Sequence, residues 1–188
     1  MRKAELPSSS GPPPERIIES RHLYMGRVLN LRLDTVERPD GRRLTREVVE
    51  HSPVVAMVPI DGDGNVLLVR QYRPAPDKAM LEIPAGCVDP GESLEEAAQR
   101  ELQEEIGCRA GHLDRLSGFY VSPGYCSELI HMFLARDLSP SRLEHDDDED
   151  IVVVPLSLAE ALDKVRSGEI DDAKSMIGLL LAAKRLRV

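Results

Sequence analysis

The alternation of hydrophobic and polar positions along the chain predicts many short strands and three helices. Asp61-Gly62-Asp63-Gly64 lies between two apolar runs and predicts a hairpin turn. Helices that lie between and after strands indicate an α/β fold, which we expect to be an α/β/α sandwich with a mixed β-sheet. Strands are predicted over residues 15–24, 27–37, 43–50, 54–60, 65–72, 113–121, 128–135 and 151–155, and helices over 94–106, 158–167 and about 173–186.

Two of the predicted helices carry capping signals at their first residues. The Ser93 side chain can accept a bond from the free backbone N–H groups, with Glu96 as its capping-box partner, and Ser157 with Glu160 repeats the pattern. Gly107 supplies a left-handed residue that ends the first helix. The boundaries of the helix over 94–106 are therefore well defined by local chemistry.

The inner face of this first helix carries acidic residues where apolar ones are expected. At 100° per residue Leu94, Ala97 and Ala98 form an apolar stripe, and Glu101 and Glu105 continue it. Clustered carboxylates are costly to bury unless a cation neutralises them, and hard oxygen ligands suit Mg²⁺ or Mn²⁺. The pattern predicts a divalent metal site; the alternative is a solvated acidic helix face.

Composition limits the classes of partner. The chain has 188 residues, 41% hydrophobic content and no long apolar run, which indicates one well-formed soluble core and no membrane partner. Its net charge of −9 disfavours nucleic acid and anionic membranes and favours a small substrate. Cys87, Cys108 and Cys126 form no CxxC pair, so we expect reduced thiols in or near the core of a cytoplasmic protein. Residues 1–14 lack an apolar signal region and are expected to be a disordered tail.

Residues 86–108 read GCVDPGESLEEAAQRELQEEIGC and match the spacing G-x5-E-x7-R-E-U-x-E-E-x-G-U of the Nudix box. The chain therefore resembles a Nudix hydrolase. The matching residues are Gly86, Glu92, Arg100, Glu101, Glu104, Glu105 and Gly107. Pro123, sixteen residues beyond Gly107, and the segments 70–74, 81–86, 122–128 and 149–151 resemble the ADP-ribose pyrophosphatase branch of this family.

The resemblance implies a role for each matching residue. Glu101 and Glu105 would be direct metal ligands, helped by the backbone carbonyl of Ala85 and by Glu104. Arg100 would support the loop–helix–loop shape, either as a partner of a box carboxylate or as an ordinary i,i+4 partner of Glu104. Substrate contacts would come from Arg73 at the diphosphate, from Ser122, Gly124 and Glu128 at the terminal ribose, and from Glu47 at the adenine or ribose, the last from the partner subunit of a homodimer.

The implied reaction is attack of water on the diphosphate of ADP-ribose, which gives AMP and ribose 5-phosphate. Glu149, in the acidic run 144–150, is the residue most compatible with the role of base. The runner-up substrates are GDP-mannose, another nucleotide sugar or FAD, and the alternative outside catalysis is a module that senses ADP-ribose. We expect an additional N-terminal β-rich segment at 15–50, which would form much of the dimer interface, and a Nudix hydrolase domain at 51–188.

Overall fold

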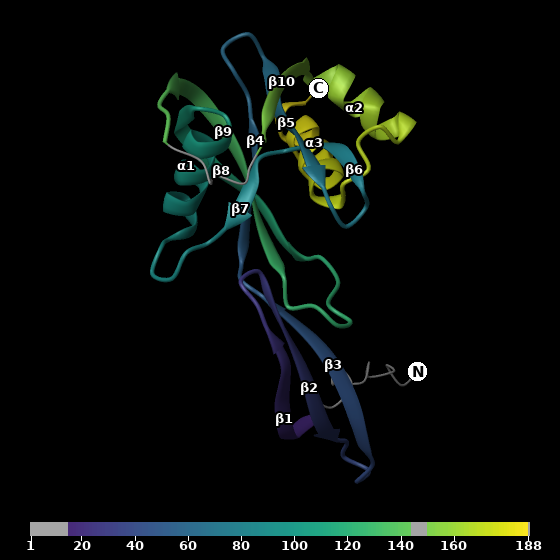
Figure 1. The fold of residues 1–188 in the computed structure, drawn as a ribbon. Helices are drawn as coiled ribbons and strands as arrows, with labels where there is room; N and C mark the ends of the chain where they lie inside the picture. Colours follow the sequence, from purple (N-terminus) through teal and green to yellow (C-terminus); the bar gives the residue numbers. More distant parts are fainter. Residues whose placement is uncertain (1–14, 144–149, 188) are drawn as a thin grey trace, which may run out of the picture. The chain divides into compact units, whose positions relative to one another are not determined.

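Figure 1 shows the computed structural model, which describes residues 15–143 and 150–187. The chain forms two compact units. The smaller unit contains residues 15–51 and 122–127, and the larger unit contains the rest of the described chain. Among the described helices, none is long and apolar enough to cross a membrane.

The smaller unit is an antiparallel sheet of three strands, coloured purple to blue in Figure 1. Its strands follow the order β1 (Arg16–Met25), β2 (Leu29–Glu37) and β3 (Arg43–His51). The segment 122–127 joins β3, because the Val49 N–H donates to the Tyr125 carbonyl at 2.7 Å and the Ser127 N–H donates to the Val49 carbonyl at 2.9 Å. All three predicted strands are confirmed.

The larger unit contains two sheets and three helices. Its strands are β4 (Val54–Pro59), β5 (Asn65–Arg73), β6 (Lys78–Glu82), β7 (Ala85–Cys87), β8 (Cys108–Tyr120), β9 (Leu129–Pro140) and β10 (Val152–Ser157). One sheet has the order β7-β4-β9-β8, in which β4 and β9 run parallel, and the other has the order β10-β5-β6 and is antiparallel. The helices are α1 (Leu94–Glu105), α2 (Leu158–Ser167) and α3 (Ala173–Leu186).

Strand β4 shows why this unit is a sandwich. All six of its residues are buried, and neighbouring side chains point to opposite faces of the sheet. Val54, Ala56 and Val58 belong to the apolar cluster that contains residues of α2 and α3, whereas Val55 and Met57 belong to the cluster that contains residues of α1. Helices therefore cover both faces, and the predicted α/β/α sandwich is confirmed.

The helix ends follow the predicted chemistry. Ser93 and Glu96 form a complete capping box at the start of α1, and Ser157 and Glu160 form another at the start of α2. Gly107, just beyond α1, has φ +67°, which is the left-handed conformation expected of it. These three signals act between residues close in sequence, which is why the sequence shows them.

The predicted strands were incomplete in the larger unit. β6 and β7 were missed, because β6 has only five residues with a charged residue at each end, and β7 has only three residues, Ala85–Cys87. β8 begins at Cys108 rather than at 113, and β9 extends to Pro140. The start of β8 was missed because Gly111 and the charged residues around it are not typical of a strand. This stretch is extended because it pairs with β9, where Cys108 lies opposite Pro140.

The predicted turn at 61–64 forms, but the strands that it joins do not make a long hairpin. The Gly64 N–H donates to the Asp61 carbonyl, and the Asp61 carboxylate accepts from the N–H groups of Asp63 and Asn65. β4 and β5 pair only through a single bridge between Ile60 and Val66 and then enter different sheets.

Candidate active site

Two acidic side chains lie on the buried face of α1, as predicted. Glu101 is 8% exposed and Glu105 is 6% exposed, beside the buried Ala97, Ala98 and Leu102. Glu105 Oε2 accepts a bond from the backbone N–H of Ala85 on β7 at 3.2 Å. The two carboxylates are therefore packed against β7 rather than directed into bulk water.

Gly86 makes this packing possible. A Cβ atom at position 86 would lie 2.0 Å from both Cδ and Oε1 of Glu101, well inside the distance at which atoms repel. The carboxyl group of Glu101 thus occupies the space that any other residue at 86 would need. This contact gives a physical reason for the spacing between the first glycine of the motif and its buried glutamate.

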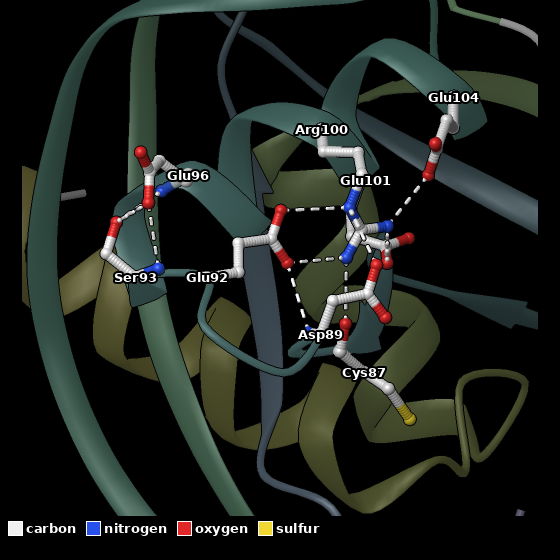
Figure 2. Close-up of polar contacts among 8 residues, drawn as sticks. All are labelled: Cys87, Asp89, Glu92, Ser93, Glu96, Arg100, Glu101 and Glu104. Carbon is white, nitrogen blue, oxygen red and sulfur yellow. Dashed lines mark hydrogen bonds and ion pairs between the residues drawn. The ribbon is translucent and has the colours of Figure 1, made fainter.

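Arg100 connects the loop before α1 to the helix itself (Figure 2). Its Nε and Nη2 atoms donate to the two carboxylate oxygens of Glu92, each at 3.0 Å. Its Nη1 atom donates to Glu101 at 2.6 Å and to Glu104 at 2.9 Å, and Nη2 also donates to the Cys87 carbonyl at 2.9 Å. Arg100 therefore makes the contacts that both interpretations require: it pairs with the motif carboxylates and it makes the i,i+4 pair with Glu104.

These contacts shift the pKa values of Arg100 and Glu92. The hydrogen bond to Glu92 raises the pKa of Arg100, and Glu101 and Glu104 add to the effect. In return, the bond from Arg100 lowers the pKa of Glu92. Arg100 thus favours the ionised form of Glu92, and its bonds to Glu101 and Glu104 hold these two carboxylates in place.

A cavity of about 290 Å³ opens beside this cluster. Its lining contains three carboxylates and one guanidinium, so its charge favours a cation, and through a cation the phosphates of a substrate. The lining residues are Ala85, Gly86, Cys87, Asp89, Arg100, Glu101 and Glu104. Asp89 was not singled out from the sequence; the only signal for it was its position inside the matched motif.

The donor set fits a hard divalent cation in its chemistry. Glutamate oxygens and the Ala85 carbonyl are the ligands that Mg²⁺ and Mn²⁺ prefer. Within residues 15–143 and 150–187, however, no three acidic, histidine or cysteine side chains are grouped as a ready metal site. Arg100 Nη1 bonds to both Glu101 and Glu104, so these two carboxylates are held by an internal cation.

Arg73 lies on β5 and is paired with a buried acid. Its Nε and Nη2 atoms donate to the two carboxylate oxygens of Glu82 on β6, each at 2.8 Å. The bond to Glu82 raises the pKa of Arg73, and the negative charge of Glu105 on α1 contributes to this shift. The Arg73 side chain is still 40% exposed, which leaves part of it accessible to a ligand.

The remaining predicted site residues are divided between the two units. Glu128 belongs to the larger unit. Partial desolvation of the Cys87 sulfur atom, and after it the negative charges of Glu101 and Glu128, raise the pKa of this thiol, although Cys87 as a residue is exposed. Ser122, Gly124 and Glu47 belong to the smaller unit, with Glu47 on β3. Glu149 lies outside the described residues.

The prediction for the thiols was correct in one respect and wrong in another. Cys87, Cys108 and Cys126 are all free. Cys87 is exposed rather than in or near the core, because it ends the short strand β7 at the edge of the cavity.

The fold and the segment 85–107 together define a class of protein: an α/β/α sandwich with a strand–loop–helix motif, in which Glu101, Glu104 and Asp89 line a polar cavity. The comparisons with known proteins agree. A family model described as NUDIX domain matches residues 50–176, and one described as nucleoside diphosphate sugar hydrolase N-terminal domain matches residues 15–49. The chain belongs to the Nudix family of hydrolases, whose members generally use divalent metal ions.

Three similar proteins illustrate the range of relatives. The chain is 38% identical over 163 residues to the ADP-ribose pyrophosphatase of Bacillus subtilis (strain 168), covering 86% of this chain and 88% of the relative. It is 36% identical over 162 residues to the GDP-mannose pyrophosphatase of Cronobacter sakazakii, covering 80% and 83%. A crystal structure of an ADP compounds hydrolase matches with a TM-score of 0.85 and 29% identity, covering 95% of this chain and 97% of that chain.

Proposed function

We propose that this protein hydrolyses the diphosphate of ADP-ribose to AMP and ribose 5-phosphate. The observation that carries the proposal is the pair Glu101 and Glu105, buried against β7 beside a polar cavity. Buried carboxylates at this position make sense as ligands for a cation that binds phosphate. The relatedness to ADP-ribose pyrophosphatases supports the choice of substrate.

The cofactor in this proposal is Mg²⁺ or Mn²⁺, held by Glu101, Glu105 and the Ala85 carbonyl with help from Glu104. Held by these residues, such an ion would supply positive charge to balance the phosphate oxygens and would lower the pKa of water. Arg100 orients Glu101 and Glu104 through the bonds described above. Arg73 binds the diphosphate through the N–H groups that its pair with Glu82 does not use.

Proton transfer from the attacking water is assigned to Glu149. The alternative base is one of the flanking residues, Asp148 or Asp150. Replacing each of the three residues separately distinguishes between them. Ser122, Gly124 and Glu128 contact the terminal ribose, and Glu47 of the partner subunit contacts the adenine or ribose. The protein acts in the cytoplasm on a small nucleoside diphosphate derivative.

The homodimer in this proposal is supported by the surface of the smaller unit. Large apolar side chains on β1, on β2 and in the turn between them are exposed to solvent: Ile17, Leu23, Tyr24, Met25, Val28 and Leu29. Two-fold symmetric pairing is the commonest way in which such a surface is covered in soluble proteins. Sedimentation equilibrium at micromolar protein should give about twice the chain mass of 20.9 kDa; a mass of one chain would rule out the dimer.

The deciding experiment is a hydrolysis screen over ADP-ribose, GDP-mannose, FAD, NADH and 8-oxo-dGTP, with Mg²⁺ and with Mn²⁺. We expect ADP-ribose to have the highest kcat/KM and to release AMP and ribose 5-phosphate in equal amounts. A higher kcat/KM for GDP-mannose would favour the second candidate, which the relatedness to GDP-mannose pyrophosphatases supports. Tight binding of ADP-ribose without turnover would favour a sensing module instead.

A further inference from the structure

A network of buried charges lies behind Arg73. Glu82 is 2% exposed, and its carboxylate contacts two cations: Arg73 on β5, and Lys174 in the first turn of α3. The Lys174 side chain is only 12% exposed and also donates to Asp172 at 3.0 Å. Lys174 therefore links two carboxylates, Glu82 and Asp172, and the network holds two cations and two acids.

The far end of this network is fixed to the backbone. Asp172 is the N-cap of α3, and its carboxylate accepts from the Ser175 N–H at 2.9 Å and from the Ser175 hydroxyl at 2.5 Å. The Ser175 hydroxyl oxygen in turn accepts from the N–H of Ile83, the residue that follows β6, at 2.8 Å. Asp172 and Lys174 are therefore tied both to the start of α3 and to the end of β6.

The two cations meet at the same oxygen atom. Glu82 Oε2 accepts from Arg73 Nη2 and from Lys174 Nζ, while Oε1 accepts from Arg73 Nε. The planar guanidinium is thus held along one edge, and three of its five N–H donors take no part in these two bonds. A guanidinium that is fixed along one edge presents the other in a set orientation.

We infer that Lys174, anchored by Asp172, positions the Arg73 guanidinium through the Glu82 carboxylate so that its unused edge can bind the substrate diphosphate. The inference rests on the proposed function, because it takes Arg73 to contact the diphosphate. The charge of Lys174 would also favour binding of an anionic substrate. Arg73 and Lys174 balance Glu82 and Asp172, whereas the same group without Lys174 carries a net charge of −1 and would repel an anionic substrate.

The test replaces Lys174 and uses a nearby lysine as the control. Lys174→Met removes the charge and keeps a long side chain, and Lys174→Arg restores the charge. Lys78 is the matched control, because it lies on β6 with Glu82 and pairs with Asp171, next to Asp172, without bonding to Glu82. Each variant is assayed for kcat and KM with ADP-ribose at saturating Mg²⁺, and for its melting temperature.

We expect Lys174→Met to raise KM about tenfold with kcat within about threefold of wild type, because the lost interaction stabilises bound substrate and transition state alike. Lys174→Arg should recover most of the affinity, and Lys78→Met should match wild type. A Lys174→Met variant that melts at a lower temperature but has the wild-type KM would overturn the inference, since a structural brace alone would behave in this way.

A second measurement does not depend on turnover. The Nε–Hε group of Arg73 gives its own NMR signal, which Arg73→Lys identifies by its disappearance. If Lys174 positions Arg73, the order parameter of this signal falls in Lys174→Met and stays close to the wild-type value in Lys78→Met; the order parameter is the readout because Lys78 lies opposite Arg73 in the β5–β6 pair and its loss alters the chemical shift alone. An unchanged order parameter in Lys174→Met overturns the inference, whereas a wild-type protein that fails to hydrolyse ADP-ribose overturns only the proposed function.

Discussion

Replacing Gly86 by alanine should disable the site without changing the fold. Gly86 has no left-handed backbone conformation, so alanine is not strained by its φ angle, and the effect comes from the added Cβ atom alone. That atom would lie 2.0 Å from the Glu101 carboxyl, and ordinary contact begins at 3.4 Å, so the carboxyl must move by about 1.4 Å. A misplacement of about 1 Å at a reacting centre costs on the order of 100-fold in rate.

The assay is steady-state hydrolysis of ADP-ribose at saturating Mg²⁺, together with a Mg²⁺ titration of the rate and a thermal melt. We expect kcat of Gly86→Ala to fall about 100-fold, with more Mg²⁺ needed for half-maximal rate. Gly62→Ala is the matched control, because a Cβ there would meet nothing within 4 Å. If Gly86→Ala keeps kcat within about threefold of wild type, the contact between Gly86 and Glu101 does not position a functional carboxylate.

Three further predictions concern acidic side chains. Glu101→Gln and Glu105→Gln should each lower kcat roughly 100-fold or more, because the amide keeps the shape of the side chain and loses its charge. The melting temperature should stay close to that of wild type. Turnover within a few-fold of wild type would show that these glutamates are not metal ligands. Glu149→Gln should lower kcat by about 10²–10⁴-fold with little change in KM, and equally small effects at Glu149 and at the two neighbouring aspartates would mean that the run is only a solvated acidic loop. Burial alone would raise the pKa of Glu82, but its bonds to two cations lower it from 4.5 to about 2. The folded-state pKa lies below the unfolded value, so this stabilisation is complete above about pH 4.5 and is lost as the pH falls toward 2. The free energy of unfolding of wild type minus that of Glu82→Gln should therefore shrink by on the order of 3 kcal/mol over that range, and a pH-independent difference would contradict the assignment.

The parts of the site that could be predicted depend on residues close together in the sequence. The cap at Ser93 and the stop at Gly107 follow from local capping chemistry, the burial of Glu101 and Glu105 follows from helix periodicity, and the structure shows each of them. The i,i+4 pair of Arg100 was visible for the same reason.

The parts that were missed depend on residues brought together by the fold. The contact between Glu82 and Lys174 joins residues 92 positions apart, and no local pattern indicates which lysine reaches a buried glutamate. The one available signal was a glutamate between apolar residues in the sequence Leu81-Glu82-Ile83, which implies a buried acid in need of a partner. The short strands β6 and β7 were missed because their partners, not their composition, make them strands.

The small N-terminal sheet has a thermodynamic consequence. Among its described residues only Asp34 and Val36 are buried, which is far too little apolar burial for a three-stranded sheet to be stable by itself. Its free energy of folding must therefore come from a surface outside the sheet. If a second copy of the chain supplies that surface, the sheet obeys mass action: its folded fraction, and the melting temperature of the protein, rise with total protein concentration.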